Sequence, residues 1–189
     1  MANAHTGWTS RGYLPHFDQP DLIQGITFRL ADALPAHVVE AWMRDPAVKT
    51  DVERRTQIEA YLNAGHGACY LRDPRIGKLV EGALQYFDGE RYRLIAWVVM
   101  PNHVHAMIEV KQGFPLRGIV QSWKSFTAHK ANDILDRKGT FWYADYFDRF
   151  IRDERHYSNA VAYIHNNPVK AGLVDDPKRW PFSSARLWR

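Results

Sequence analysis

The residue types best suited to chemistry stand in two short runs of the chain. In the first run, 97–110, His103 and His105 are separated by one residue within an alternating apolar stretch. Successive side chains of a β-strand point to opposite faces, so both imidazoles would share one face, while Val104 and Ala106 lie on the other. Neutral imidazole binds divalent metals, although the same spacing also suits a packed, hydrogen-bonded pair. A metal site therefore needs a further ligand.

The second run, 163–172, could supply that ligand. Tyr163 and Asn167 are four residues apart and would project from the same side of a helix. Because Pro168 disfavours helical backbone at the preceding residue, we expect the helix to end at Asn167, and an Asn-Asn-Pro run is also an ordinary helix stop. If this flank faces the histidine strand, His103, His105 and Asn167 become three protein ligands and leave room for a substrate oxygen.

A tyrosine beside such a metal suggests phosphoryl transfer. Its ordinary pKa is near 10, so the phenol is a poor nucleophile until its target is polarised. A hard divalent cation can polarise a phosphoryl oxygen, and mixed imidazole and amide-oxygen ligands suit Mg²⁺ or Mn²⁺. Attack by Tyr163 would give a covalent phosphotyrosine. This product conserves the energy of the broken phosphodiester for rejoining, which distinguishes strand transfer from hydrolysis.

The elements that must position these residues follow from periodicity and from turn residues. The expected strands are 23–30, 92–99 and the histidine strand from 103, and the expected helices are 35–45, 50–63, 74–87, 115–136 and 153–166. Residues 68–72 are expected as a brief extended piece. Pro101 suits the tight turn that joins the last two strands as an antiparallel hairpin. Segregated antiparallel strands and helices predict an α+β fold.

Composition limits the class of protein. With 189 residues, 46% hydrophobic and 24% charged, the chain suits one globular domain, and a net charge of +4 permits a polyanionic partner. A single cysteine, Cys69, excludes an internal disulfide and fits a reducing cytosol. There is no secretory signal profile and no apolar run of membrane-spanning length, so we expect a soluble, cytoplasmic protein. The expected organisation is an arm at 1–20, a domain at 21–175 and a tail at 176–189.

Taken together, the two runs resemble a known family. Met-Pro-Asn-His-Val-His at 100–105 and Tyr-Ile-His-Asn-Asn-Pro-Val-Lys-Ala-Gly-Leu at 163–173 are similar to the single-tyrosine HUH transposases. Within them, the chain most resembles the REP-associated tyrosine transposases, relatives of the IS200/IS605 enzymes. The similarity covers nearly the whole chain and includes Gly-Tyr-Leu-Pro-His-Phe at 12–17 and Tyr-Phe-Asp-Arg at 146–149.

The resemblance implies a ferredoxin-like α+β HUH fold, with a central antiparallel sheet and helices packed on it. It implies a Mg²⁺- or Mn²⁺-dependent endonuclease, monomeric or homodimeric, that acts on single-stranded DNA with palindromic hairpins. Tyr163 would form a 5′-phosphotyrosine and free a 3′-hydroxyl, while His103, His105 and Asn167 hold the metal. The best-known insertion-sequence members carry glutamine where this chain has Asn167, so here a shorter side chain must reach the ion.

Arms in relatives help to read a short sequence beside the hairpin, which suggests DNA contacts in this chain as well. The candidate DNA-binding residues are Arg11, Tyr13, His16, Lys124, Arg149, Arg152 and Lys170. For Lys124, on the expected wet side of its helix, and for the later basic residues, a solvated surface role is equally reasonable.

Several other side chains have a structural reading beside a functional one. His156 and His165 suit structural roles better than catalytic ones. Glu109 is either a second-shell group or a solvated strand end, and Tyr157 is expected in the core. Trp142, Tyr143 and Tyr146 could stack on bases or pack inside.

Two other functions remain open at this stage. One is a domesticated DNA-binding module that recognises repeat hairpins without chemistry, and the other is a hydrolytic nuclease that uses metal-bound water. The presence of His103, His105 and Tyr163 together favours strand transfer.

Overall fold

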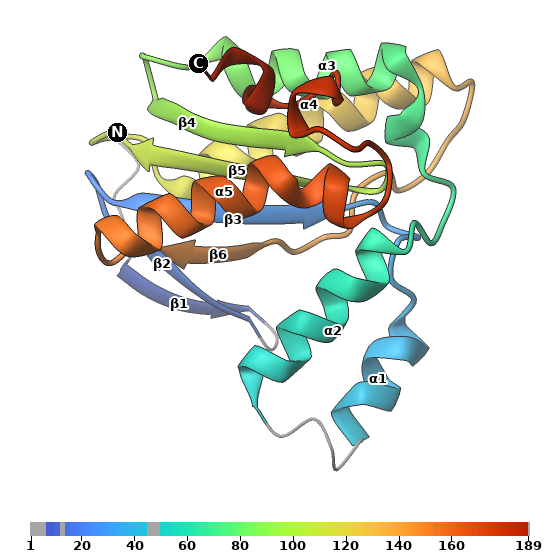
Figure 1. Ribbon diagram of the computed structural model, residues 1–189, viewed down its shortest axis with the longest axis horizontal. Coiled ribbons are helices and arrows are strands. Elements are labelled where there is room, and N and C mark those ends of the chain that lie inside the picture. Colours follow the sequence, from blue (N-terminus) through green and yellow to red (C-terminus); the bar gives the residue numbers. More distant parts are fainter. Residues whose placement is uncertain (1–6, 12–13, 45–49, 189) are drawn as a thin grey trace.

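A four-stranded antiparallel sheet forms the centre of the computed structural model (Figure 1). The structure describes residues 7–11, 14–44 and 50–188. The strands are β3 (Ile23–Arg29), β4 (Tyr92–Val99), β5 (His103–Val110) and β6 (Phe147–Phe150), and their order across the sheet is β4-β5-β3-β6. With its intervening helices this is the ferredoxin-like βαββαβ arrangement, so the predicted α+β fold is confirmed.

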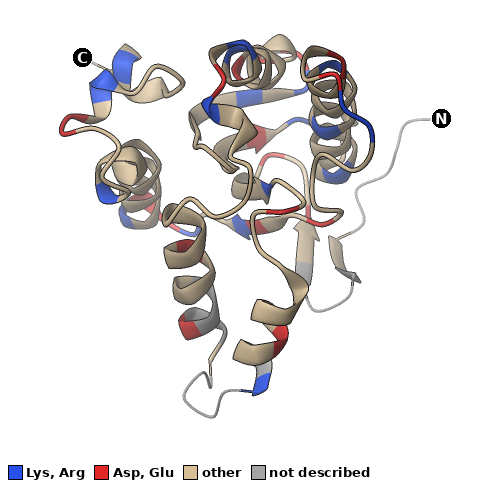
Figure 2. Cartoon of the chain, turned by 90° about the vertical axis from the view of Figure 1, so that its right-hand side faces the viewer, with Lys and Arg blue, Asp and Glu red and all other residues tan. Residues whose placement is uncertain are grey.

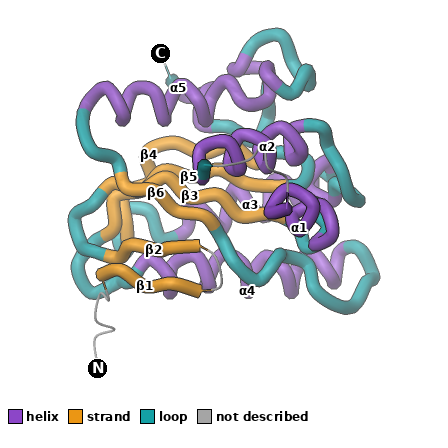
Figure 3. The backbone as a smooth tube through the Cα atoms, turned by 90° about the horizontal axis from the view of Figure 1, so that it is seen from below, coloured by secondary structure: helices purple, strands orange, loops and turns teal. Residues whose placement is uncertain are grey.

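Helices cover both faces of the sheet. Helices α3 (Pro74–Tyr86) and α4 (Leu116–Ile134) pack on one face, and α5 (Glu154–Lys170) lies on the other (Figure 3). The alternation of β5 explains this division, because Val104, Ala106, Ile108 and Val110 belong to the core under α3 and α4. On the opposite face Met107 packs with Val161 and Ile164 of α5. Both histidines share the face of Met107, which places them beneath α5.

Helix α5 begins within one residue of its predicted start at 153, whereas its end differs from the prediction. Asp153 caps the helix, since its carboxylate accepts a hydrogen bond from the His156 amide at 2.7 Å. The helix was expected to end at Asn167, but it continues through Pro168 to Lys170. Asn167 stays helical because it is buried and its carbonyl accepts the Ala171 amide at 3.0 Å. The tertiary packing of this last turn outweighs the local preference of a residue before proline.

Two segments before α3 differ in how well the sequence predicts them. Helices α1 (Ala36–Arg44) and α2 (Asp51–Asn63) form as expected, and α2 begins with a capping box between Thr50 and Glu53. Figures 1 and 2 show this pair projecting from the sheet. Residues expected as extended at 68–72 instead contain a 3₁₀ turn, η1 (Tyr70–Arg72), so that prediction was wrong.

The N-terminal arm is a β-hairpin where the structure describes it. Strands β1 (Gly7–Arg11) and β2 (Leu14–Asp18) pair antiparallel. The hairpin is fixed to β6 by Asp148, whose carboxylate accepts hydrogen bonds from the ring of His16 and from the amide of Phe17. The rings of Trp8 and Phe17 contact each other and the ring of Phe150 of β6 at tilted or edge-on angles.

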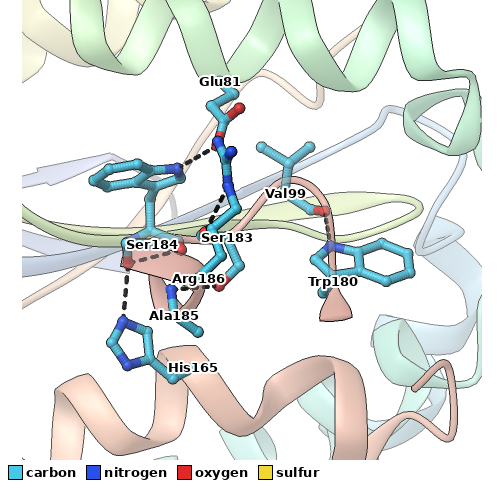
Figure 4. Close-up of polar contacts among 9 residues, drawn as sticks. Glu81, Val99, His165, Trp180, Ser183, Ser184, Ala185 and Arg186 are labelled. Atoms are coloured by element: carbon cyan, nitrogen blue, oxygen red, sulfur yellow. Dashed lines mark hydrogen bonds and ion pairs between the residues drawn. The ribbon is translucent and has the colours of Figure 1, made fainter. Parts of the chain in front are cut away.

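The C-terminal segment folds back onto β4 and α5 (Figure 4). It contains two 3₁₀ turns, η2 (Pro177–Arg179) and η3 (Ser184–Leu187). The Ser184 hydroxyl accepts the Trp97 amide at 2.9 Å and lies 2.9 Å from the His165 ring of α5. Arg186 pairs with Glu81 of α3 at 2.8 Å. The segment therefore joins both helical layers to one strand. Among the described residues, no helix has the length and apolar character needed to cross a membrane.

Candidate active site

Strand β5 holds the two histidines in fixed orientations. The His103 ring lies with its Nδ1 2.7 Å from the Asn102 amide oxygen, and His105 Nδ1 lies 2.8 Å from the Thr27 hydroxyl. The Asn102 amide group itself donates to the His66 carbonyl at 2.9 Å, which fixes its oxygen as the atom facing His103. An amide oxygen can only accept, so His103 Nδ1 carries the proton and Nε2 carries the lone pair.

Both imidazoles are neutral. Burial lowers the pKa of His105 to about 3, and burial together with the neighbouring His105 ring holds the pKa of His103 well below its usual range. The ring centroids lie 4.8 Å apart. Neutral, buried and oriented imidazoles are the form in which histidine binds a divalent metal.

Helix α5 brings Tyr163 and Asn167 to the same place. The Tyr163 ring meets the His105 ring edge-on, with 5.3 Å between their centroids. His105 Nε2, the Tyr163 hydroxyl and both polar atoms of the Asn167 amide are buried and make no hydrogen bond of ordinary geometry within the described chain. Buried polar groups without partners are costly, so three of them on facing elements indicate a site built for a ligand.

The donor set fits a divalent metal. Among the described residues, no group of three or more His, Cys, Asp or Glu side chains is placed to hold one. The available donors at this site are instead two imidazoles, His103 and His105, and the buried amide oxygen of Asn167. Such a mixed nitrogen and oxygen set suits Mn²⁺ or Mg²⁺, with further positions supplied by substrate or water.

A cleft of about 290 Å³ gives access to this cluster. Its walls come from β3, β5, β6, α2 and α5, and His105 and Tyr163 both line it, whereas His103 and Asn167 are buried and do not line it. Three residues at or beside the site were not predicted from the sequence: Glu59 of α2, Thr27 of β3 and Asn102. Only Asn102 had a sequence signal, since it directly precedes His103.

The environment of Tyr163 keeps its phenol protonated. Burial, and next the charge of Glu59, raise the pKa of Tyr163 above its ordinary value near 10. The ammonium of Lys170, the last residue of α5, lies 4.9 Å from the centre of the Tyr163 ring. A protonated phenol must pass its proton to an acceptor before or during attack on a phosphorus atom.

The predicted DNA contacts fall into two groups. Arg149 is exposed and lines the cleft, and Arg152 and Lys170 are also exposed. His16 and Lys124 are buried in contacts inside the protein. Tyr13 and the side chain of Arg11 lie outside the described residues.

Lys124 was expected on the solvent side of its helix, and that expectation was wrong. Its ammonium donates to the carbonyls of Tyr143 and Ala144 at 2.7 and 2.6 Å. Burial lowers the pKa of Lys124 to about 8. The loop after α4 therefore uses this lysine as a donor for its own backbone. His16 likewise makes contacts inside the protein, because its ring contacts Asp145 at 3.1 Å as well as Asp148.

The three aromatic residues that were expected either to stack on bases or to pack inside make contacts within the protein. Trp142 is buried and donates to Thr127 at 2.9 Å. Tyr143 lies beneath the Arg29 guanidinium, 3.6 Å from its ring centre, and Tyr146 stacks on the ring of His16.

The remaining polar candidates are also accounted for. Glu109 forms an ion pair with Arg93 of β4 at 2.6 Å. His165 contacts Ser184, whereas His156 lines the cleft. Tyr157 packs against the apolar cluster beneath α5, as expected for a core residue.

Comparisons with known proteins place the chain in a family. A family model described as "Transposase IS200 like" matches residues 71–167, just over half of the 189-residue chain. A REP-associated tyrosine transposase of Escherichia coli strain K12 is 28% identical over 93 residues, covering 49% of this chain and 54% of that protein. An uncharacterized protein of Haemophilus influenzae is 30% identical over 102 residues, covering 41% of this chain and 54% of that protein. The matches thus span about half the length of these curated relatives.

A solved structure shares the fold. The structure of a REP-associated tyrosine transposase bound to a REP hairpin aligns with a TM-score of 0.57 at 17% identity, covering 93% of this chain and 82% of that chain. The segment matched by the family model includes the histidine strand, Tyr163 and Asn167. This chain belongs to the IS200-like transposase family.

Proposed function

We propose that this protein is a metal-dependent endonuclease that nicks and rejoins single-stranded DNA at palindromic repeat hairpins through a 5′-phosphotyrosine. One observation carries the proposal: the Tyr163 hydroxyl is buried without a hydrogen-bond partner of ordinary geometry. The Tyr163 ring contacts the His105 ring, and Asn167 lies about one turn further along the same helix. The structural neighbour is bound to a REP hairpin, which supports the class of substrate.

In this proposal His103, His105 and Asn167 hold Mg²⁺ or Mn²⁺. The ion, when bound, polarises a non-bridging oxygen of the scissile phosphate and so lowers the barrier to attack. Thr27 and Asn102 would help to hold the imidazoles in place for the ion, because they contact the Nδ1 atoms.

Tyr163 provides the nucleophile. Its hydroxyl oxygen forms a bond to phosphorus as the bond from phosphorus to the 3′-oxygen breaks, which leaves a 5′-phosphotyrosine and a free 3′-hydroxyl. Rejoining is the reverse reaction, in which a 3′-hydroxyl attacks the phosphotyrosine. Arg149 and Arg152, exposed at and near the cleft, are placed to contact DNA phosphates, and Lys170 lies at the end of the same helix as Tyr163.

Replacing Tyr163 by phenylalanine tests the chemistry. Tyr163→Phe removes only the hydroxyl oxygen, so we expect unchanged hairpin binding and complete loss of the covalent protein–DNA adduct on a denaturing gel. Tyr157→Phe is the matched control, because Tyr157 lies on the same helix but packs in the core.

The same gel separates the two other functions. A hairpin-binding protein without chemistry would leave the labelled strand intact with the parent protein and Mn²⁺. A hydrolytic nuclease would release free ends and trap no protein on DNA. Either outcome, or an adduct that persists in Tyr163→Phe, contradicts the proposal.

A further inference from the structure

We propose that Glu59 of α2 orients the Tyr163 hydroxyl and takes its proton when Tyr163 attacks the phosphorus atom. This role rests on the proposed function, since it assigns an acceptor to the nucleophile named there. Glu59 lies outside the segment 71–167 that the family model matches, so that match does not include it.

The cleft brings Glu59 to the reacting group. Glu59, His105 and Tyr163 come from α2, β5 and α5, and all three line the same cleft of about 290 Å³. Figure 3 shows α2 on the side of the sheet that α5 covers. Tyr163 therefore shares this cleft with a histidine of β5 and with a carboxylate from a separate helix.

Packing fixes the position of α2. Leu62 is buried in the main core, and Ile58 and Tyr61 pack against that core. Tyr61 also stacks on His66, with 3.9 Å between the ring centroids. These anchored neighbours on both sides of Glu59 hold its carboxylate at the cleft, which is what an oriented proton acceptor requires.

Glu59 is better placed than the other candidate acceptor in the cleft. His156 also lines the cleft, but its Nδ1 faces the Arg152 amide at 3.3 Å. The charge of Glu59 contributes to the raised pKa of Tyr163, whereas His156 makes no such contribution.

The proton balance of the reaction is simple. As the bond from the Tyr163 oxygen to phosphorus forms, the phenolic proton passes to the Glu59 carboxylate, and the departing 3′-oxygen takes a proton from water. In rejoining, protonated Glu59 returns the proton to the leaving Tyr163 oxygen, and the attacking 3′-hydroxyl loses its own proton to water. Glu59 is then ready for another cycle.

The experiment compares adduct formation with hairpin binding in four proteins: the parent, Glu59→Gln, Glu59→Ala and the control Glu40→Gln. Glu40 is an exposed carboxylate of α1, so its variant makes the same change in charge away from the cleft. Each protein is incubated with a labelled hairpin strand and saturating Mn²⁺, and the rate of adduct formation and the Kd for the hairpin are measured.

We expect Glu59→Gln to form the adduct roughly 100-fold more slowly, the usual scale of a lost general base. Its Kd should be unchanged or tighter, because a negative charge near the DNA has been removed. Added formate should restore part of the rate to Glu59→Ala, since a small carboxylate can occupy the vacated space. Glu40→Gln should react at the parental rate.

Three results would overturn this role. They are a parental rate in Glu59→Gln, a loss of rate in Glu59→Ala that formate does not restore, and a parallel loss of hairpin binding and thermal stability. A parent protein that binds the hairpin without forming an adduct would contradict the proposed function and this role together. If the parent forms the adduct and Glu59→Gln forms it at the same rate, only the role of Glu59 is contradicted, and the proposed function stands.

Discussion

At the scale of single residues, the proposed chemistry depends on two pairs of side chains, one pair on β5 and the other on α5. His103 and His105 were predicted to share a strand face, and Tyr163 and Asn167 a helix flank, because both spacings are local repeats of a regular element. The structure has both arrangements. Their roles in catalysis remain proposals.

The residues that were missed depend on long-range pairing. Thr27 lies beside His105 only because β3 and β5 pair in the register that sets these two residues opposite each other. Glu59 reaches the cleft through a helix pair that leaves the sheet after β3 and returns before α3. Neither of these contacts between distant segments produces a repeating pattern of residues in the local sequence that could predict it.

Thr27 provides a prediction at this scale. Thr27→Val keeps the size of the side chain but removes the hydroxyl that binds His105 Nδ1 at 2.8 Å. The ring then loses its fixed orientation, and we expect Mn²⁺ affinity to fall about 10- to 100-fold with little change in unfolding temperature. A Mn²⁺ titration of the purified protein measures this. Thr140→Val, at an exposed loop position, is the control. Equal Mn²⁺ affinity in the parent and Thr27→Val would show that this hydroxyl does not support a metal ligand.

At the scale of elements, strong apolar periodicity predicted the bounds of helices and strands well, whereas a short strand without such periodicity was not predicted. The long helices and the β4–β5 hairpin have several apolar repeats each, and their bounds were predicted to within a few residues. Strand β6 has four residues, two of them charged, and was not foreseen. Its pairing with β3 is set by the sheet rather than by its own composition.

The contact between Ser184 and α5 provides a prediction for an element. The Ser184 hydroxyl accepts the Trp97 amide of β4 and contacts His165, so Ser184→Ala leaves a buried N–H without a partner. We expect a loss of about 1–3 kcal/mol in the free energy of unfolding, measured by urea denaturation. Adduct formation should also slow, because α5 carries Tyr163. Ser158→Ala, on an exposed face of α5, should change neither quantity. A Ser184→Ala protein as stable as the parent would mean that water replaces the lost contact.

At the scale of the whole molecule, the charges of the chain are spread rather than gathered. Figure 2 shows Lys and Arg positions interspersed with Asp and Glu positions along the backbone in that view. The net charge of +4 is small, so binding to a polyanion would depend on a few well-placed cations rather than on the overall field. Arg149 at the cleft is the clearest of these.

This placement predicts how hairpin binding responds to salt. Each phosphate contact contributes close to one unit to the slope of log K against log salt concentration. Arg149→Ala should weaken hairpin binding and reduce that slope by about one unit. Fluorescence anisotropy over a range of NaCl concentrations measures both. Arg179→Ala, which removes a cation already paired with Asp175, is the comparison. A slope that is the same for Arg149→Ala and the parent would exclude Arg149 from the DNA interface.

The C-terminal segment also limits how two copies of the chain could assemble. Strand β4 pairs on one side with β5, and on its other side Val98 bridges to Ser183 and the Val99 amide donates to the Phe182 carbonyl at 2.9 Å. These backbone groups would otherwise form an open border that a strand from a second molecule could extend. A strand from a second molecule therefore cannot pair with Val98 and Val99 unless residues 182–183 first detach.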